Sequence, residues 1–116
     1  MNELRLETGT NILIGKPAKP IARRQVKKIS DLLHDIDEIR EAHLPEVFAV
    51  GTMETSTPVL FIVVDPESAI PAVMEKLAGP LSEMLARQSL DVWPVGKAHD
   101  IVPTVRDANC LIGWRD

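Results

Sequence analysis

Residues 59–64 constrain the fold of this chain more than any other segment. They are six consecutive apolar residues with strong β preference, set between Pro58 and Asp65. Successive side chains of a strand point to opposite faces of the sheet. One face would carry Val59, Phe61 and Val63, and the other would carry Leu60, Ile62 and Val64. Since neither set is polar, the segment predicts a central strand that is covered on both faces.

The flanking sequence predicts two amphipathic helices and several more strands. Residues 20–35 place apolar side chains at helical spacing, and Pro20 suits the start of a helix. Residues 65–68 supply an N-cap, an early proline and an acidic first turn for a second helix. Pro80 should kink or break that helix near Ala78, because proline has no N–H to donate. The other predicted elements are strands at residues 11–14, 39–50 (with a break at Pro45) and 90–95, a short helix capped at His99 or Asp100, and a last strand or docked tail at 111–114.

This order of elements predicts an α+β fold. Strand, helix, strand, strand, helix, strand is the ferredoxin-like βαββαβ arrangement, an antiparallel sheet with two helices on one face. A C-terminal helix and strand are then an addition. The second face of the sheet is also apolar, and leaving it in water would expose a patch on the order of several hundred Å². We therefore expect residues 100–114 and a second subunit each to cover part of that face.

Composition indicates one ordered, soluble domain. The chain has 116 residues, 45% of them hydrophobic and 26% charged, and we expect a flexible N-terminus at 1–9 and a single domain at 10–116. The lone Cys110 has no internal disulfide partner, which suits a reducing cytoplasm. No segment has the pattern of a signal peptide or a membrane span. With a formal net charge of -4, neither nucleic acid nor a membrane is an expected partner.

Several stretches carry a family resemblance. Residues 9–18 contain a glycine, a short strand and Gly-x-Pro-Ala, and residues 36–44 contain an acidic helix exit followed by an Ala-x-Leu strand. The strand at 58–64, the second helix and residues 90–94 complete the pattern. Over about residues 8–105 the chain resembles the C-terminal domain of the enhanced serine sensitivity protein family (SseB). This resemblance implies a bacterial cytosolic protein and supplies no catalytic residues.

Cys110, His99 and Asp100 are the residue types of a thiol nucleophile with its base and orienting group. The alternative interpretation is a small buried cysteine in an apolar segment, with His99 and Asp100 capping the short helix. The sequence favours this second interpretation, so no catalytic residue is predicted.

Metal and acid–base sites find little support in the sequence. A structural zinc site needs four nitrogen or sulfur ligands, and the three histidines are dispersed without paired spacing: His34, His43 and His99. No metal or cofactor is therefore predicted. Five carboxylates have the pattern of a solvated helix end and strand edge rather than of an acid–base pair: Asp31, Asp35, Asp37, Glu38 and Glu41.

Basic side chains gather at the start of the first predicted helix. Six of the thirteen basic residues lie there: Lys16, Lys19, Arg23, Arg24, Lys27 and Lys28. The five carboxylates named above follow these basic residues along the chain. Bases before acids is the reverse of what the helix dipole favours, since it stabilises acids near the helix start by about 0.3–1 kcal/mol each. A solvated face is one interpretation, because exposed charges are screened. A partner-binding patch is the other. RNA and single-strand binders need aromatic stacking residues, which are few here.

We expect a non-enzymatic protein-interaction or regulatory domain that self-associates through its sheet as a homodimer and binds an unidentified protein partner. The alternative is a domain that senses a small molecule such as an amino acid, which rests on fold-level analogy.

Overall fold

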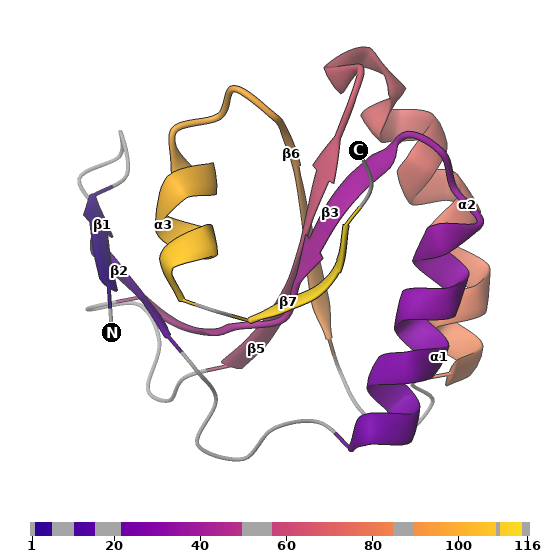
Figure 1. Ribbon diagram of the computed structural model, residues 1–116, viewed down its shortest axis with the longest axis horizontal. Coiled ribbons are helices and arrows are strands. Elements are labelled where there is room, and N and C mark those ends of the chain that lie inside the picture. The colour runs from indigo at the N-terminus through magenta and orange to yellow at the C-terminus, as the bar shows by residue number, and fades with distance from the viewer. Residues whose placement is uncertain are drawn as a thin grey trace.

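The computed structural model describes residues 2–5, 11–15, 22–49, 57–84, 90–108 and 110–114, which form a mixed α+β fold with three α-helices (Figure 1). Its elements in chain order are β1 (Asn2–Arg5), β2 (Asn11–Gly15), α1 (Arg23–His34), β3 (Ile39–His43), β4 (Glu46–Ala49), β5 (Thr57–Val64), a 3-10 turn η1 (Glu67–Ala69), α2 (Ile70–Met84), β6 (Asp91–Gly96), α3 (Ile101–Asp107) and β7 (Leu111–Trp114).

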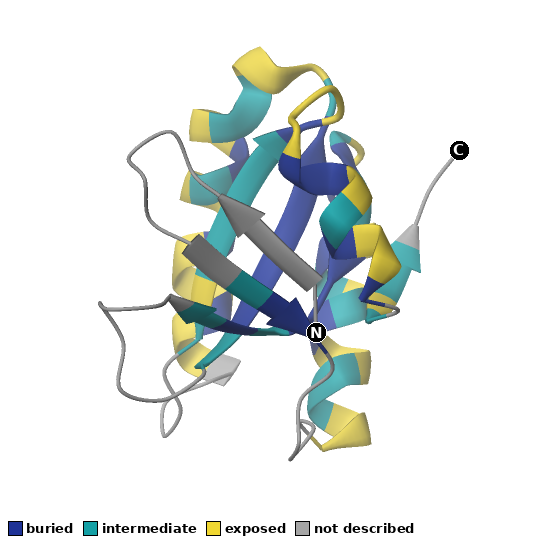
Figure 2. Ribbon diagram, turned by 90° about the vertical axis from the view of Figure 1, so that its left-hand side faces the viewer, coloured by how far each residue is buried: buried dark blue, intermediate teal, exposed yellow. Residues whose placement is uncertain are grey.

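Both faces of β5 are buried, as its sequence predicts. Residues 59–64 are each at most 2% exposed. The side chains divide between two cores: Leu60, Ile62 and Val64 lie in one, and Val59 and Phe61 lie in the other. Figure 2 shows this strand as the buried centre of the molecule.

β3 and β4 behave as one bent strand along one edge of β5. From Glu41 to Val47 the antiparallel register with β5 does not change, although the bend falls between the two strands. At the bend, the backbone N–H of Val59 donates to the carbonyl of Pro45 at 3.0 Å. The predicted strand with a break at Pro45 is therefore confirmed. The outer edge of this bent strand pairs with β7 beside β3 and with β2 beside β4.

The strand order differs from the expected ferredoxin-like order, which is not confirmed. The sheet runs β1-β2-β4-β5-β3-β7, and β6 also pairs with β5. In a split βαβ unit another strand separates the two parallel strands, whereas β5 and β6 pair directly and in parallel. The difference arises because β2 pairs with β4 rather than with β5. This leaves the second edge of β5 open to the strand that returns from α2.

α1 and α2 cover one face of the sheet, as predicted (Figure 1). Ile29 and Leu33 of α1 and Val73 and Leu77 of α2 pack against alternate side chains of β5. These positions have helical spacing, so each helix buries one stripe and leaves its other side exposed.

α3 covers the second face. Ile101, Val105 and Ala108 pack with Val59 and Phe61 of β5. The sheet curls so that the β1–β2 pair lies on the far side of α3 (Figure 1). The expectation that residues 100–114 supply cover is confirmed. Since one chain buries both faces of β5, no second subunit is needed to cover this strand. The exposed apolar face that was the reason to expect association through the sheet is therefore absent at β5.

Two local features differ from expectation. Asn2–Arg5, assigned from sequence to a flexible N-terminus, forms β1 and pairs with β2. The sequence also predicts a kink or a break in the second helix near Ala78; the helix is not broken there, because α2 continues to Met84. Lys76, Gly79 and Pro80 all lie on the exposed side of α2. Because Pro80 has no N–H, the carbonyl of Lys76 receives no helical hydrogen bond from it. Water can solvate that carbonyl, so the helix tolerates the proline.

Candidate functional site

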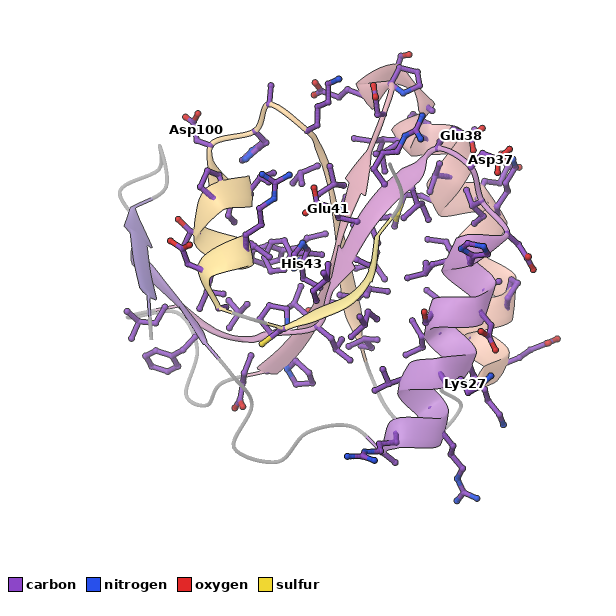
Figure 3. The ribbon with its side chains drawn as sticks, viewed as in Figure 1. Lys27, Asp37, Glu38, Glu41, His43 and Asp100 are labelled. Carbon is purple, nitrogen blue, oxygen red and sulfur yellow. The ribbon has the colours of Figure 1, made fainter. Side chains whose placement is uncertain are left out.

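The start of α1 presents a basic surface, which we define as Arg23, Arg24, Lys27 and Lys28. All four side chains are exposed. Lys27 Nζ lies 3.4 Å from Asp31 Oδ2, and both side chains are mostly in water. Figure 3 shows Lys27 on the side of α1 that faces away from the sheet. Lys16 and Lys19, which the sequence places in the same patch, lie outside the described residues.

The beginning of α1 lacks the features that normally stabilise a helix start. Its N-cap is Ala22, which makes no side-chain cap, and its first turn has no acidic residue. Asp31 and Asp35 are exposed at the other end, where carboxylates are disfavoured by the helix dipole. The basic-to-acidic order inferred from the sequence is therefore present on an exposed helix face.

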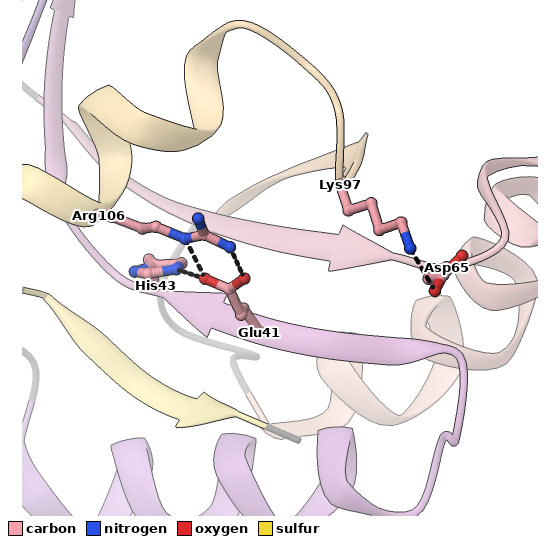
Figure 4. A network of polar contacts seen from close by, with 5 residues as sticks. All are labelled: Glu41, His43, Asp65, Lys97 and Arg106. Atoms are coloured by element: carbon pink, nitrogen blue, oxygen red, sulfur yellow. Dashed lines mark hydrogen bonds and ion pairs between the residues drawn. The ribbon is translucent and has the colours of Figure 1, made fainter. Parts of the chain in front are cut away.

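A polar cluster joins β3 to α3 on the second face of the sheet (Figure 4). The carboxylate of Glu41 accepts from Arg106 Nε at 2.9 Å, and a second bond joins Arg106 Nη2 to Glu41 Oε2. Nε2 of His43 lies 3.0 Å from Glu41 Oε1. The Glu41 side chain is 17% exposed and that of His43 is 3% exposed, whereas the Arg106 side chain is 54% exposed.

The carboxylate of Glu41 and the guanidinium of Arg106 stabilise each other in their charged forms. The hydrogen bonds from Arg106 hold the pKa of Glu41 below its usual value, and this effect outweighs burial, which acts in the opposite direction. The same pairing raises the pKa of Arg106. Since the ring of His43 is almost fully buried, a substrate has no direct access to it. The cluster therefore fastens α3 to β3 rather than offering an exposed acid–base pair.

Sequence reasoning missed this cluster. Glu41 and His43 are two residues apart on a strand and therefore share a face, which is a readable signal. Arg106 lies 65 positions from Glu41, so only the tertiary fold brings it there. The partly buried Glu41 also differs from the solvated strand edge that the sequence indicates.

The possible thiol site is not assembled. His99 and Cys110 lie beyond opposite ends of α3. Nδ1 of His99 accepts a hydrogen bond from the backbone N–H of Ile101 at 3.1 Å and so caps α3, whereas Asp100 makes no side-chain cap. The half-buried Cys110 places Sγ 3.3 Å from the carbonyl oxygen of Ala108.

Within the described part of the chain, no group of three or more His, Cys, Asp or Glu side chains could hold a metal ion. The helices described there are also too short or too polar to cross a membrane.

A half-open pocket of about 300 Å³ lies between α1, β3 and β7. Its apolar lining includes Leu33 and Ile112, and its polar lining includes Ser30, His34 and Arg40. Ser30 Oγ donates to the carbonyl of Ile112 at 3.1 Å, which ties β7 to α1 at this pocket. The sequence did not predict this pocket, because it forms where α1 meets a strand from the other end of the chain.

Comparison with known families matches residues 6–107 to the SseB protein C-terminal domain. No curated protein and no solved structure matches the chain.

Proposed function

Since this chain belongs to the SseB protein C-terminal domain family, we propose that it is a non-enzymatic protein-interaction or regulatory domain that docks a partner on the basic surface of α1. One observation carries the proposal. Arg23, Arg24, Lys27 and Lys28 are all exposed in the first two turns of a helix without an acidic first turn. This arrangement costs helix stability, and a partner with carboxylates would offset the cost.

The faces of β5 and the edge at β6 are weaker candidates for the docking surface than α1. Both faces of β5 are already covered, by α1 and α2 on one side and by α3 on the other. β6 pairs with β5 on one edge and contains Pro94, which has no N–H to donate to an added strand.

An acidic protein surface fits this site better than a nucleic acid. Phe61 is 1% exposed, and its ring meets Trp93 edge to face at a centroid distance of 5.0 Å. These two rings lie in the core under α3, so they do not form a stacking platform beside the basic surface.

A matched pair of charge reversals tests the proposal. R24E/K28E removes two cations from the basic surface, whereas K76E/K97E reverses two exposed cations on α2 and after β6 and changes the net charge equally. Each variant is compared with the wild-type chain for proteins retained from native lysate by quantitative mass spectrometry. We expect R24E/K28E to lose a partner that K76E/K97E retains. Equal retention by both variants would contradict the proposal.

The pocket between α1 and β7 supports a second candidate function, the sensing of a small molecule such as an amino acid. Its volume of about 300 Å³ falls at the lower end of the range for ligand sites. Arg40 and His34 could receive a carboxylate, and Leu33 and Ile112 could contact an apolar side chain.

Thermal unfolding with a panel of amino acids tests this second function. A ligand at a hundred times its Kd should stabilise the fold by about 2.7 kcal/mol and raise the Tm by several degrees. Gly113→Ala is the matched variant, because a Cβ there would approach only Ser30 Oγ, at 3.5 Å, and would narrow the pocket without a clash. A Tm shift that persists in Gly113→Ala would place the ligand elsewhere, and no shift across the panel would contradict sensing of amino acids.

A further inference from the structure

We infer that two copies of this chain associate through the outer faces of α1, with the helices antiparallel around a two-fold axis. This inference rests on the proposed function, because it assigns the partner of the basic surface. The partner is the acidic end of α1 in a second copy.

Four of the exposed charges on and just after α1 form one stripe with opposite signs at its two ends. Arg24 and Lys28 lie in the first half of α1, Asp31 lies in its last turn, and Asp35 is the C-cap residue that follows the helix. Their spacings of four, three and four residues place them along one side of an α-helix. At about 1.5 Å per residue, the stripe from Arg24 to Asp35 is about 16 Å long.

Two copies of this stripe have complementary charges when their helices run antiparallel. In an antiparallel pair centred between residues 29 and 30, Arg24 faces Asp35 of the second copy and Lys28 faces Asp31 of the second copy. A two-fold axis repeats both contacts, so each copy uses the same surface. The antiparallel arrangement also brings carboxylates of the second copy beside the uncapped, basic start of α1, where the helix dipole favours them.

A general acidic partner fits this stripe less well. Its carboxylates would meet Arg24 and Lys28 but would be repelled by Asp31 and Asp35 along the same helix face. A second copy supplies a matching acidic and then basic order by symmetry. In each chain Lys27 Nζ lies 3.4 Å from Asp31 Oδ2, so Lys28 of the second copy would share this carboxylate with Lys27.

Exposed ion pairs are screened by salt, so the association should be strongest at low ionic strength. The Debye length falls from about 30 Å at 0.01 M salt to about 3 Å at 1 M. We expect wild-type dimers at low salt that dissociate as salt is added.

Charge reversal with rescue tests the pairing by sedimentation equilibrium at low and high salt. R24D/K28D makes the stripe acidic throughout, D31K/D35K makes it basic throughout, and R24D/K28D/D31K/D35K exchanges the two ends. Each half-reversed variant should associate with itself at least about tenfold more weakly than the wild type. The exchanged variant should regain the wild-type dissociation constant within about threefold, and the two half-reversed variants should associate with each other when mixed. Circular dichroism confirms that each variant is folded.

A wild-type chain that stays monomeric at low salt would overturn the inference, as would an exchanged variant that does not dimerise. The lysate experiment tests the proposed function independently of the two-fold pairing. If R24E/K28E still loses a lysate protein that K76E/K97E retains, the basic surface remains a docking site for another partner although the two-fold pairing is excluded.

Discussion

Glu41 is the residue through which the C-terminal helix is fastened to the sheet. Its carboxylate accepts hydrogen bonds from Arg106 of α3 and contacts His43 on its own strand. A second ion pair joins Lys97, directly after β6, to Asp65, directly after β5 (Figure 4). The side chain of Lys97 is mostly exposed. The more buried Glu41 should therefore contribute more to stability than the Lys97 pair.

We predict that Glu41→Gln lowers the free energy of unfolding at neutral pH by about 1–2 kcal/mol, because the charge-assisted bonds to Arg106 become neutral ones. The folded pKa of Glu41 lies below its usual value of 4.5. The contribution of the carboxylate is therefore complete above that value and is lost as the pH falls through the folded pKa.

Urea unfolding of wild type and Glu41→Gln across this pH range measures the effect. The two stability curves should converge in acid. Lys97→Met serves as the control, and its effect should be the smaller of the two at neutral pH. A difference between wild type and Glu41→Gln that stays constant into acid would contradict the assigned role of the charge.

At the scale of elements, the bend at Leu44 and Pro45 organises the sheet. The backbone N–H of Leu44 donates to the carbonyl of Cys110 at 2.9 Å, where β7 begins. Sγ of Cys110 lies 4.0 Å from the carbonyl of Gly15, where β2 ends. β2 and β7 thus meet end to end along the outer edge of the bent strand.

The helices and strands themselves were largely predictable because their signals are local. The apolar run at residues 59–64, the helical stripe of α1 and the break at Pro45 are each encoded within a short segment. The pairing of β2 with β4, and of β7 with β3, depends on which strand edges remain free after folding. No short segment carries that information, so the predicted strand order is wrong although most of the elements, β1 excepted, were predicted.

Pro80 offers a prediction at this scale. It lies inside α2 on the exposed side, where its ring removes one backbone hydrogen bond. Pro80→Ala should restore that bond and raise the free energy of unfolding by about 1–2 kcal/mol, after allowance for the greater entropy of the unfolded chain.

Thermal and urea unfolding of Pro80→Ala should both show the gain. Gly79→Ala is the neighbouring control, because a Cβ there meets nothing within 4 Å. Its gain should be about 0.5–1 kcal/mol and come from helix propensity alone. A loss of stability in Pro80→Ala would mean that the proline has a packing role in α2 that its exposure does not indicate.

At the scale of the whole molecule, one chain builds two cores on a single sheet. The sequence correctly indicated that β5 needs cover on both sides, and it identified residues 100–114 as one source of that cover. It also favoured a second subunit as another source, since the sequence does not show how far the sheet curls around a seven-residue helix. The curl brings β1 and β2 against α3, so a short helix is sufficient.

The polar cluster of Glu41, His43 and Arg106 could not be predicted from the sequence, because it also depends on how α3 is placed on the sheet. α3 must first be placed on the second face before Arg106 can reach β3. The basic surface was predictable in part, because Arg23, Arg24, Lys27 and Lys28 lie on one helix. The complementary arrangement of their acidic neighbours became clear only with the exposed positions of α1 in view.

Hydrogen exchange of the β5 backbone amides is the measurement that tests most directly whether a lone chain covers both faces of its sheet. Exchange is followed by mass spectrometry in high salt at two protein concentrations about a hundredfold apart. The account predicts that residues 59–64 are the most protected segment and that their protection is the same at both concentrations. Protection that rises with concentration would contradict it, because a second copy would then be covering a face that α3 leaves open.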